Sequence, residues 1–391
     1  FFQAEDGIRD VERSRGLGDV YKRQLELSYI VKELDALIDA KLDKIYHPDK
    51  KMLLLQFHIT GKGKKILRIS VPDYIYTTDY KEKSPEKPSG FCMVLRKNLE
   101  QSRLRSIKQI GSERIIELLF EKKEKHKLFI ELFSPGNIVL CKEDETIISA
   151  LETKKWKDRT IRGGIAYTFP KREINFFDLK KKELKELLKS TEKDSIVTCL
   201  AINLGLGGVY AEEVCLLTKI DKKTSPKKIN ESNLNSLLKA IKSLCSRKIN
   251  PCSVYNKKEL VDIVPFSLEL YKNFEKKDFK SYNKALDNYF TKQVKEEKVD
   301  ESELRYKKEL DKLNKIIEEQ KKQVERMETS IKINNQRAEF IYTNYKLIDE
   351  ILKEIKKARE KYSWKEIKEK LKGHKIIKDI NEKEGKIILE I

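Results

Sequence analysis

The first predicted elements are a helix and a series of short strands. Apolar residues recur at helical spacing between Leu27 and Ala40. The runs that follow are short and rich in β-branched and aromatic residues, with turn residues such as Gly61 and Gly63 between them. A helix is expected from Phe91 to about Leu104. Strands are predicted at 42–46, 52–58, 66–71, 74–77, 114–120, 127–132, 137–141 and 146–151. Residues 25–173 are therefore predicted to form one α+β domain.

The pattern becomes helical over residues 174–250, where leucine and isoleucine recur at helical spacing and lysines occupy the opposite face. Within this stretch, an apolar helix end is followed by Gly205 and Gly207 and then by a second helix. This order is typical of a helix-hairpin-helix, whose second helix can direct free N–H groups at a phosphate. An ordinary glycine-capped turn between two helices has the same spacing. Spacing alone leaves both interpretations open.

A heptad repeat begins near Leu304, with apolar residues at alternating steps of three and four. Gln320 and Asn334 occupy two positions of its seam. One long helix and a hairpin of two helices fit the repeat equally well. The sequence therefore predicts a coiled-coil/middle region over residues 304–391, joined to the helical domain by a helical connector at 251–303.

Two smaller elements are expected at the end of this region. Residues 364–372 have the spacing of a short helix, and two alternating runs around Glu384 and Gly385 predict a strand pair. The chain ends within this pattern, which predicts a C-terminal truncation.

The charge of the chain adds a partner class to this picture. Lys and Arg number 84 against 64 Asp and Glu, a formal net charge of +20. Such an excess favours a polyanion such as RNA, DNA or an anionic membrane, although a lysine-rich proteome would give the same number. The sequence has neither an apolar run long enough to span a bilayer nor a secretion signal, so a cytoplasmic protein without a membrane partner is expected.

The cysteines and histidines favour no metal or disulfide chemistry. The six cysteines are scattered without a C-x-x-C pair, and the four histidines are isolated from one another. This distribution predicts reduced thiols and no zinc site. No cofactor and no small-molecule substrate are expected.

Residues 1–24 differ from the rest of the chain, because they show neither helical nor strand periodicity. They resemble translated sequencing-adaptor read-through, and they are excluded from the predictions of fold. The segment holds five basic and five acidic residues, so its exclusion leaves the net charge at +20.

Several phrases of the sequence, in this order, resemble the NFACT family, which includes the NEMF and RqcH factors and proteins labelled fibronectin-binding protein A-like. They are Lys32-Glu33-Leu34 with Asp43-Lys44-Ile45-Tyr46, Phe91-Cys92-Met93-Val94-Leu95-Arg96-Lys97-Asn98-Leu99 with Gln109-Ile110-Gly111-Ser112-Glu113-Arg114, Gly205-Leu206-Gly207-Gly208-Val209-Tyr210-Ala211-Glu212-Glu213, and Ala285-Leu286-Asp287-Asn288-Tyr289-Phe290. The resemblance implies an N-terminal NFACT domain similar to a glycosylase N-domain, a helix-hairpin-helix domain and a coiled-coil/middle region. It also implies a C-terminal RNA-binding domain, which this sequence lacks.

The resemblance implies a function in ribosome-associated quality control. Such factors bind a large ribosomal subunit that holds a stalled peptidyl-tRNA, and they contact rRNA and tRNA. They recruit aminoacyl-tRNA, commonly alanyl-tRNA, so that the nascent chain is extended without mRNA. The ribosome forms the peptide bond, so the chain itself is not expected to be an enzyme. This agrees with the lack of a P-loop, a metal cluster or a catalytic triad pattern in the sequence.

The resemblance also assigns candidate RNA-binding residues. The family typically has an Asp-Arg pair at Glu113-Arg114 and an Asp at Glu26, positions that it implicates in tRNA handling. Glutamate keeps the charge there but extends it by one methylene, which leaves tailing in question. The alternative role of both positions is a surface ion pair of little energetic weight.

Two basic stretches could add contacts with phosphates. Arg96 and Lys97 are adjacent on a predicted helix. Lys155 and Arg159 flank Trp156, whose ring could stack on an unpaired base. A solvated lysine-rich face and a partly buried Trp are the simpler alternatives. Gly205 and Gly207 complete the candidate tRNA- and rRNA-binding residues.

Three other functions remain as alternatives. A DNA-glycosylase-like enzyme would share the fold of the first domain, but fold alone does not carry function, and no proline stands near Leu25 to supply a nucleophilic amine. A fibronectin-binding surface adhesin would need secretion. A purely structural coiled-coil protein would show no salt-dependent binding of RNA.

Overall fold

The structure is a computed structural model that describes residues 23–82, 84–156, 159–170 and 174–390, apart from the side chains of 294–305 and 308. It has two compact units, Phe1–Glu297 and Lys298–Ile391. Most of the predicted adaptor-derived segment lies outside the described residues. Arg23 and Gln24 are described and belong to the fold, since Gln24 begins the first helix, α2 (Gln24–Leu34).

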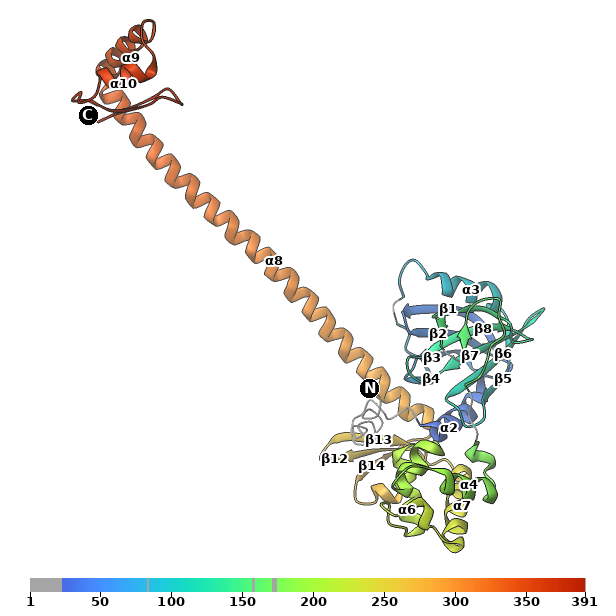
Figure 1. Ribbon diagram of the computed structural model, residues 1–391. Helices are drawn as coiled ribbons and strands as arrows, with labels where there is room; N and C mark the ends of the chain where they lie inside the picture. The colour runs from blue at the N-terminus through green and yellow to red at the C-terminus, as the bar shows by residue number, and fades with distance from the viewer. Residues whose placement is uncertain (1–22, 83, 157–158, 171–173, 391) are drawn as a thin grey trace. The chain divides into compact units, whose positions relative to one another are not determined.

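An antiparallel sheet dominates the first half of unit 1 (Figure 1). Within the described residues it has nine strands in the order β4-β3-β2-β1-β5-β6-β7-β8-β9. The eight strands expected from the sequence are confirmed. The bounds are β1 Lys41–Asp49, β2 Met52–Ile59, β3 Gly63–Ser70, β4 Tyr74–Thr78, β5 Arg103–Gln109, β6 Ile115–Glu121, β7 Lys125–Glu131, β8 Asn137–Lys142 and β9 Ile147–Ala150.

One strand of this sheet, β5, is not expected from the sequence, because the sequence pattern predicts the end of a helix there. The helix α3 (Gly90–Leu99) begins at Ser89, whose hydroxyl accepts a hydrogen bond from the Cys92 N–H, and it ends before β5. The register of β5 against β6 shifts between Leu104 and Ser106. This bulge interrupts the alternation of buried and exposed residues, so the strand lacks the period-two signal.

The second half of unit 1 is helical up to residue 246, as predicted. Its elements are η3 (Phe176–Asp178), α4 (Lys181–Ser190), α5 (Ile196–Thr198), the π-helical η4 (Cys199–Asn203), α6 (Gly208–Thr218), η5 (Pro226–Lys228) and α7 (Glu231–Ser246). A two-stranded ribbon of β10 (Lys154–Lys155) and β11 (Thr160–Ile161) precedes them. The α+β class is confirmed.

The prediction of a helical connector over 251–303 is wrong for its first half. Residues 252–278 form a three-stranded sheet in the order β13-β12-β14. The strands are β12 (Cys252–Asn256), β13 (Glu259–Val264) and β14 (Glu275–Asp278), with η6 (Glu269–Tyr271) between the last two. They form because Val254 and Ile263 place apolar side chains in the core of unit 1. The helix begins only at Tyr282.

One continuous core joins the sheet, the helices and the small sheet of unit 1. Helix α2 lies between the nine-stranded sheet and the helices α6 and α7 (Figure 1). It buries Leu25, Ile30 and Leu34 there. A second cluster, which includes Phe129 and Tyr167, covers the other face of β6–β9. The position of α2 at the centre of the unit is what organises the site described below.

Unit 2 contains most of α8 (Tyr282–Thr343), followed by α9 (Tyr345–Arg359), α10 (Trp364–Lys370), β15 (Ile377–Asn381) and β16 (Lys386–Leu389). The predicted short helix and strand pair are confirmed. The heptad repeat does not form one element, because the helix is interrupted at Asn344. Beyond it, Ile351 and Ile355 pack into a small core with Ile367 and Ile380. Along α8, the seam residues Leu313, Met327 and Ile331 are exposed.

Candidate functional site

Two of the phrases singled out in the sequence meet at the start of α2. The amide of Gln109, at the end of β5, donates hydrogen bonds to the carbonyl oxygens of Gln24 at 3.0 Å and Glu113 at 2.9 Å. This ties the turn of Glu113 and Arg114, between β5 and β6, to the first residues of α2. Both residues are partly exposed. The junction of these segments is therefore the candidate functional site.

The Gly-x-Gly turn lies against the same end of α2. Gly205 and Gly207 have φ angles of +81° and +79°, which side chains other than glycine rarely adopt. A Cβ atom on Gly207 would lie 3.5 Å from Cγ of Arg23. Between the two glycines, Leu206 is buried in the core. The turn therefore positions the start of α6 next to the start of α2.

A buried polar network lies beneath the junction. The Arg23 guanidinium is 2.7 Å from Oε1 of Glu26 and 2.8 Å from Oδ2 of Asp262, on β13. The Tyr210 hydroxyl, on α6, donates to Oε1 of Glu26 at 3.0 Å. The Tyr271 hydroxyl donates to Oδ2 of Asp262 at 2.6 Å. The network joins α2, the helical domain and the small sheet.

Glu26 is completely buried in this network. Burial raises its pKa to about 8, against the attraction of Arg23, and the charge of Asp262 raises it further. One guanidinium faces two carboxylates, so a proton on Glu26 relieves the excess negative charge. Its Oε2 atom has no hydrogen-bond partner among the described residues. Glu26 therefore acts within the fold, and its side chain does not reach the surface where RNA could contact it.

We expect the buried Glu26 to make the stability of the chain fall as pH rises. The folded state holds the Glu26 proton up to about pH 8, whereas an exposed glutamate loses it near 4.5. Stability from this group is therefore complete below about pH 4.5 and is lost as pH rises through about 8. Glu26→Gln removes the titration. Urea denaturation between about pH 5 and pH 8 should show a smaller loss of unfolding free energy for Glu26→Gln than for the parent chain.

Glu212→Gln provides the control, because Glu212 lies at the surface of α6 and pairs with Lys222 at 3.3 Å. Its pH profile should follow that of the parent chain. An identical profile for Glu26→Gln would contradict the assignment of a buried proton to Glu26.

A second buried carboxylate fixes α6 to the small sheet. Glu213 accepts hydrogen bonds from the backbone N–H groups of Glu269 and Leu270, each at 3.0 Å, and Arg247 lies 3.6 Å from it. Its two oxygens thus satisfy N–H groups at the start of η6 that have no partner within that short helix. The third phrase of the sequence therefore supplies two buried contacts, through Tyr210 and Glu213.

The first phrase also meets the residues just before the fourth. The Glu33 carboxylate, on α2, accepts hydrogen bonds from the backbone N–H groups of Tyr282 at 2.8 Å and Asn283 at 2.7 Å. It caps α8, where a negative charge is favoured by the helix dipole. Asn283 also bonds both backbone groups of Thr77, on β4. The sequence did not reveal the structural roles of Glu33, Tyr210, Glu213 and Asp262. The first three lie in the quoted phrases, and this position was the only signal in the sequence that pointed to them.

The structure separates Arg96 from Lys97. Arg96 donates to the carbonyl oxygen of Ile45 through Nε at 3.0 Å and Nη2 at 2.7 Å, so it anchors α3 to β1. It also lies 3.6 Å from Glu100. Lys97 is exposed on the same helix. Of the two, Lys97 has the more exposed side chain and is the candidate for a phosphate contact.

Lys155 and Arg159 also have different surroundings. Lys155 is exposed on β10. Arg159 is largely buried and forms an ion pair with Glu131, which also accepts a hydrogen bond from the Tyr167 hydroxyl at 2.9 Å. The Arg159 guanidinium lies 5.8 Å from the centre of the Trp156 ring, which is partly exposed. Arg159 thus holds the β10–β11 ribbon in place and leaves Lys155 and Trp156 at the surface.

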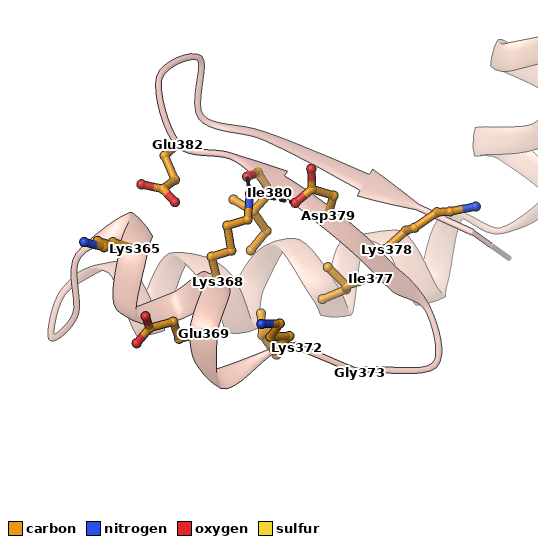
Figure 2. Close-up of a pocket in the computed structure, with 11 residues that line it drawn as sticks. Lys365, Lys368, Glu369, Lys372, Gly373, Ile377, Lys378, Asp379, Ile380 and Glu382 are labelled. Carbon is orange, nitrogen blue, oxygen red and sulfur yellow. Dashed lines mark hydrogen bonds and ion pairs between the residues drawn. The ribbon is translucent and has the colours of Figure 1, made fainter.

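Unit 2 carries a basic cavity of its own, of about 350 Å³, between α10 and β15. Figure 2 shows lysines and carboxylates interleaved around it. Lys368 pairs with Asp379 at 2.8 Å and donates to the carbonyl oxygen of Ile380 at 3.1 Å. Lys378 pairs with Glu390 at 2.8 Å. These pairs compensate much of the positive charge.

Across the described part of the chain, His, Cys, Asp and Glu side chains form no group of three or more that could hold a metal ion. Among the helices of that part, none combines the length and the apolar character needed to cross a membrane.

The comparisons with known proteins agree with the phrases of the sequence. The family model described as NFACT N-terminal and middle domains matches residues 24–383. The archaeal Rqc2 homolog aRqcH of Methanocaldococcus jannaschii is 31% identical over 387 residues, covering 94% of this chain and 57% of that protein. The human ribosome quality control complex subunit NEMF is 26% identical over 375 residues, covering 88% of this chain and 34% of that protein.

The chain thus spans only part of the curated relatives it matches, about half in the archaeal case. Among solved structures, the N-terminal part of the fibronectin/fibrinogen-binding protein from Streptococcus suis superposes with a TM-score of 0.56 at 23% identity, covering 69% of this chain and 99% of that one. The fibrinogen binding protein from Staphylococcus aureus gives 0.57 at 21% identity, covering 69% and 98%. These two likenesses establish the fold of the first unit.

Proposed function

Because the chain belongs to the NFACT family, we propose that it acts in ribosome-associated quality control, by binding large ribosomal subunits that still carry a peptidyl-tRNA. The observation that carries this proposal is the family match, which spans the sheet domain, the helical domain and most of unit 2 in one order. The net charge of +20 supports an RNA partner, since rRNA and tRNA are polyanions. A function on ribosomes implies that the protein acts in the cytoplasm.

In this proposal the ribosome forms the peptide bond. The chain recruits and orients tRNA, commonly alanyl-tRNA, so that the nascent chain is extended without mRNA. Its own residues bind and position, and no acid, base or nucleophile of the chain takes part in the chemistry. The buried groups at the junction, Glu26 and Asp262, serve the arrangement of the three segments around them.

The proposed tRNA contact lies at the turn of Glu113 and Arg114. A guanidinium can hold a phosphate through two parallel hydrogen bonds, and Arg114 stands partly exposed at the turn. Gln109 fixes this turn relative to α2. Gly205 and Gly207 bring the start of α6 to the start of α2. In this proposal that helix end supplies a further phosphate contact, as in a phosphate-binding helix-hairpin-helix. Glu26 contributes indirectly, because its buried contacts with Arg23 and Tyr210 hold α2 and α6 together.

We expect Arg114→Ala to weaken tRNA binding roughly tenfold, because one charge-assisted contact contributes about 1–3 kcal/mol. Filter binding with deacylated tRNA at low salt measures the effect. Arg105→Ala is the matched control, since Arg105 is an exposed arginine on the adjacent strand β5 that pairs with Asp39 and Glu121. Equal losses in both variants would show that only bulk charge matters, and would contradict a specific contact at the turn.

A further inference from the structure

A second cavity lies in unit 1, between the small sheet and the first turns of α8. It measures about 370 Å³, within the range of sites that hold small organic groups. The sheet contributes Ser253, Tyr255 and Lys277, and the helix contributes Asn288, Tyr289 and Lys292. The cavity is separate from the junction at the start of α2.

The strand register explains why the sheet residues share one face. Ser253 and Tyr255 are two residues apart on β12, so their side chains lie on one side of the sheet and the side chain of Val254 lies on the other. Lys277 is directly opposite Ser253 on β14. Leu260 is opposite Tyr255 on β13. Antiparallel partners share a face, so all four side chains are directed towards α8.

The helix completes the cavity through residues at helical spacing. Ala285, Asn288, Tyr289 and Lys292 are three, four and seven residues apart, so they form one stripe of α8. Glu33 caps this helix and Asn283 ties it to β4, so the stripe is held in place on unit 1. Tyr289 also packs on Phe290 at 5.0 Å between ring centres.

The lining combines aromatic rings with positively charged side chains. Tyr255, Phe279 and Tyr289 supply three rings, and the described residues that line the cavity include three lysines and no carboxylate. Nζ of Lys277 lies 5.8 Å from the centre of the Phe279 ring. The cavity of unit 2 differs in both respects, since its lysines are interleaved with carboxylates and it has no aromatic lining residue among those described.

We propose that this cavity binds unpaired nucleotides of RNA, an inference that rests on the proposed function and adds a second contact to it. Base rings stack on aromatic side chains, and the lysines at the rim meet the flanking phosphates. The amides of Asn288 and Gln293 offer donors and acceptors to a base edge. A duplex, whose bases are already stacked, cannot use the rings.

The test uses the full chain and a short, unstructured, fluorescently labelled oligoribonucleotide, with binding followed by anisotropy. Tyr255→Ala should weaken binding at least about tenfold, whereas Tyr255→Phe, which keeps the ring, should stay within about twofold of the parent chain. Lys277→Ala should weaken binding and lower the salt slope by about one. Lys272→Ala is the matched control, because this lysine is 76% exposed beside the same sheet and does not line the cavity.

Lys277 is exposed, so its substitution leaves the fold intact even where Tyr255→Ala unfolds the small sheet. The inference is overturned when Lys277→Ala and Lys272→Ala weaken binding equally, or when duplex RNA of equal length binds as tightly as the single strand. A parent chain that binds large subunits but not the oligonucleotide also overturns it and leaves the proposed function standing. A chain that binds the oligonucleotide through Tyr255 but binds no subunit supports the cavity and overturns the proposed function.

Discussion

Glu213→Ala is expected to lower the free energy of unfolding by about 3–5 kcal/mol. The carboxylate is completely buried, and its removal leaves the N–H groups of Glu269 and Leu270 unpaired and the Arg247 charge without its partner. Glu212→Ala, at the adjacent position, removes only a surface pair with Lys222 and should cost about 0–1 kcal/mol. Urea denaturation followed by circular dichroism measures both variants.

Comparing Glu213→Ala with Glu212→Ala distinguishes the loss of a buried structural carboxylate from the loss of a surface charge. Both positions carry glutamate on α6, and the substitutions change the net charge equally. Equal stability losses in the two variants would mean that Glu213 does not fix α6 to η6. A large loss for Glu213→Ala alone would establish that this buried carboxylate fixes α6 to η6.

Arg159→Ala should have an effect of similar size, about 3–5 kcal/mol, because it leaves the Glu131 carboxylate buried without its ion pair. The Tyr167 hydroxyl remains its hydrogen-bond donor, but a hydroxyl does not neutralise the charge. Lys155→Ala should leave stability unchanged, since Lys155 is exposed on the same ribbon.

The order of the effects of Arg159→Ala and Lys155→Ala should be reversed when RNA binding is measured in place of stability. At a temperature where both are folded, Lys155→Ala should weaken binding of large subunits and reduce its salt dependence, whereas Arg159→Ala should affect binding only as far as the β10–β11 ribbon is displaced. Thermal unfolding and co-sedimentation on the same preparations provide the two measurements. Arg159→Ala with parental stability would contradict the buried ion pair.

The sequence alone predicted the elements that have a clear apolar pattern. The short apolar runs of β2, β3 and β7, and the helical spacing of α2 and α7, were enough to predict the α+β domain and the helical domain. It failed at β5, where a bulge breaks the alternation, and at β12–β14, whose short strands are interrupted by lysines and carboxylates. Such elements depend on tertiary pairing more than on local pattern.

The candidate site was predictable only in part, for a related reason. The candidate positions Glu26, Glu113 and Gly207 indicated that these segments matter, and the structure brings the segments together. Their individual roles depend on partners far away in the sequence, such as Asp262 for Arg23 and Ile45 for Arg96. Sequence spacing does not show whether a basic residue meets a carboxylate, a carbonyl oxygen or solvent. For this reason Arg96 and Arg159 could not be distinguished from Lys97 and Lys155 beforehand.

Selective binding of stalled large subunits tests the central claim most directly. The full chain is sedimented with large subunits that carry peptidyl-tRNA, and with the same subunits after puromycin has released the nascent chain and the tRNA has been removed. We expect at least about tenfold more chain on the obstructed subunits, since contact with the tRNA adds to contact with rRNA, and Arg114→Ala should reduce this ratio. Equal binding to both kinds of subunit would contradict the account.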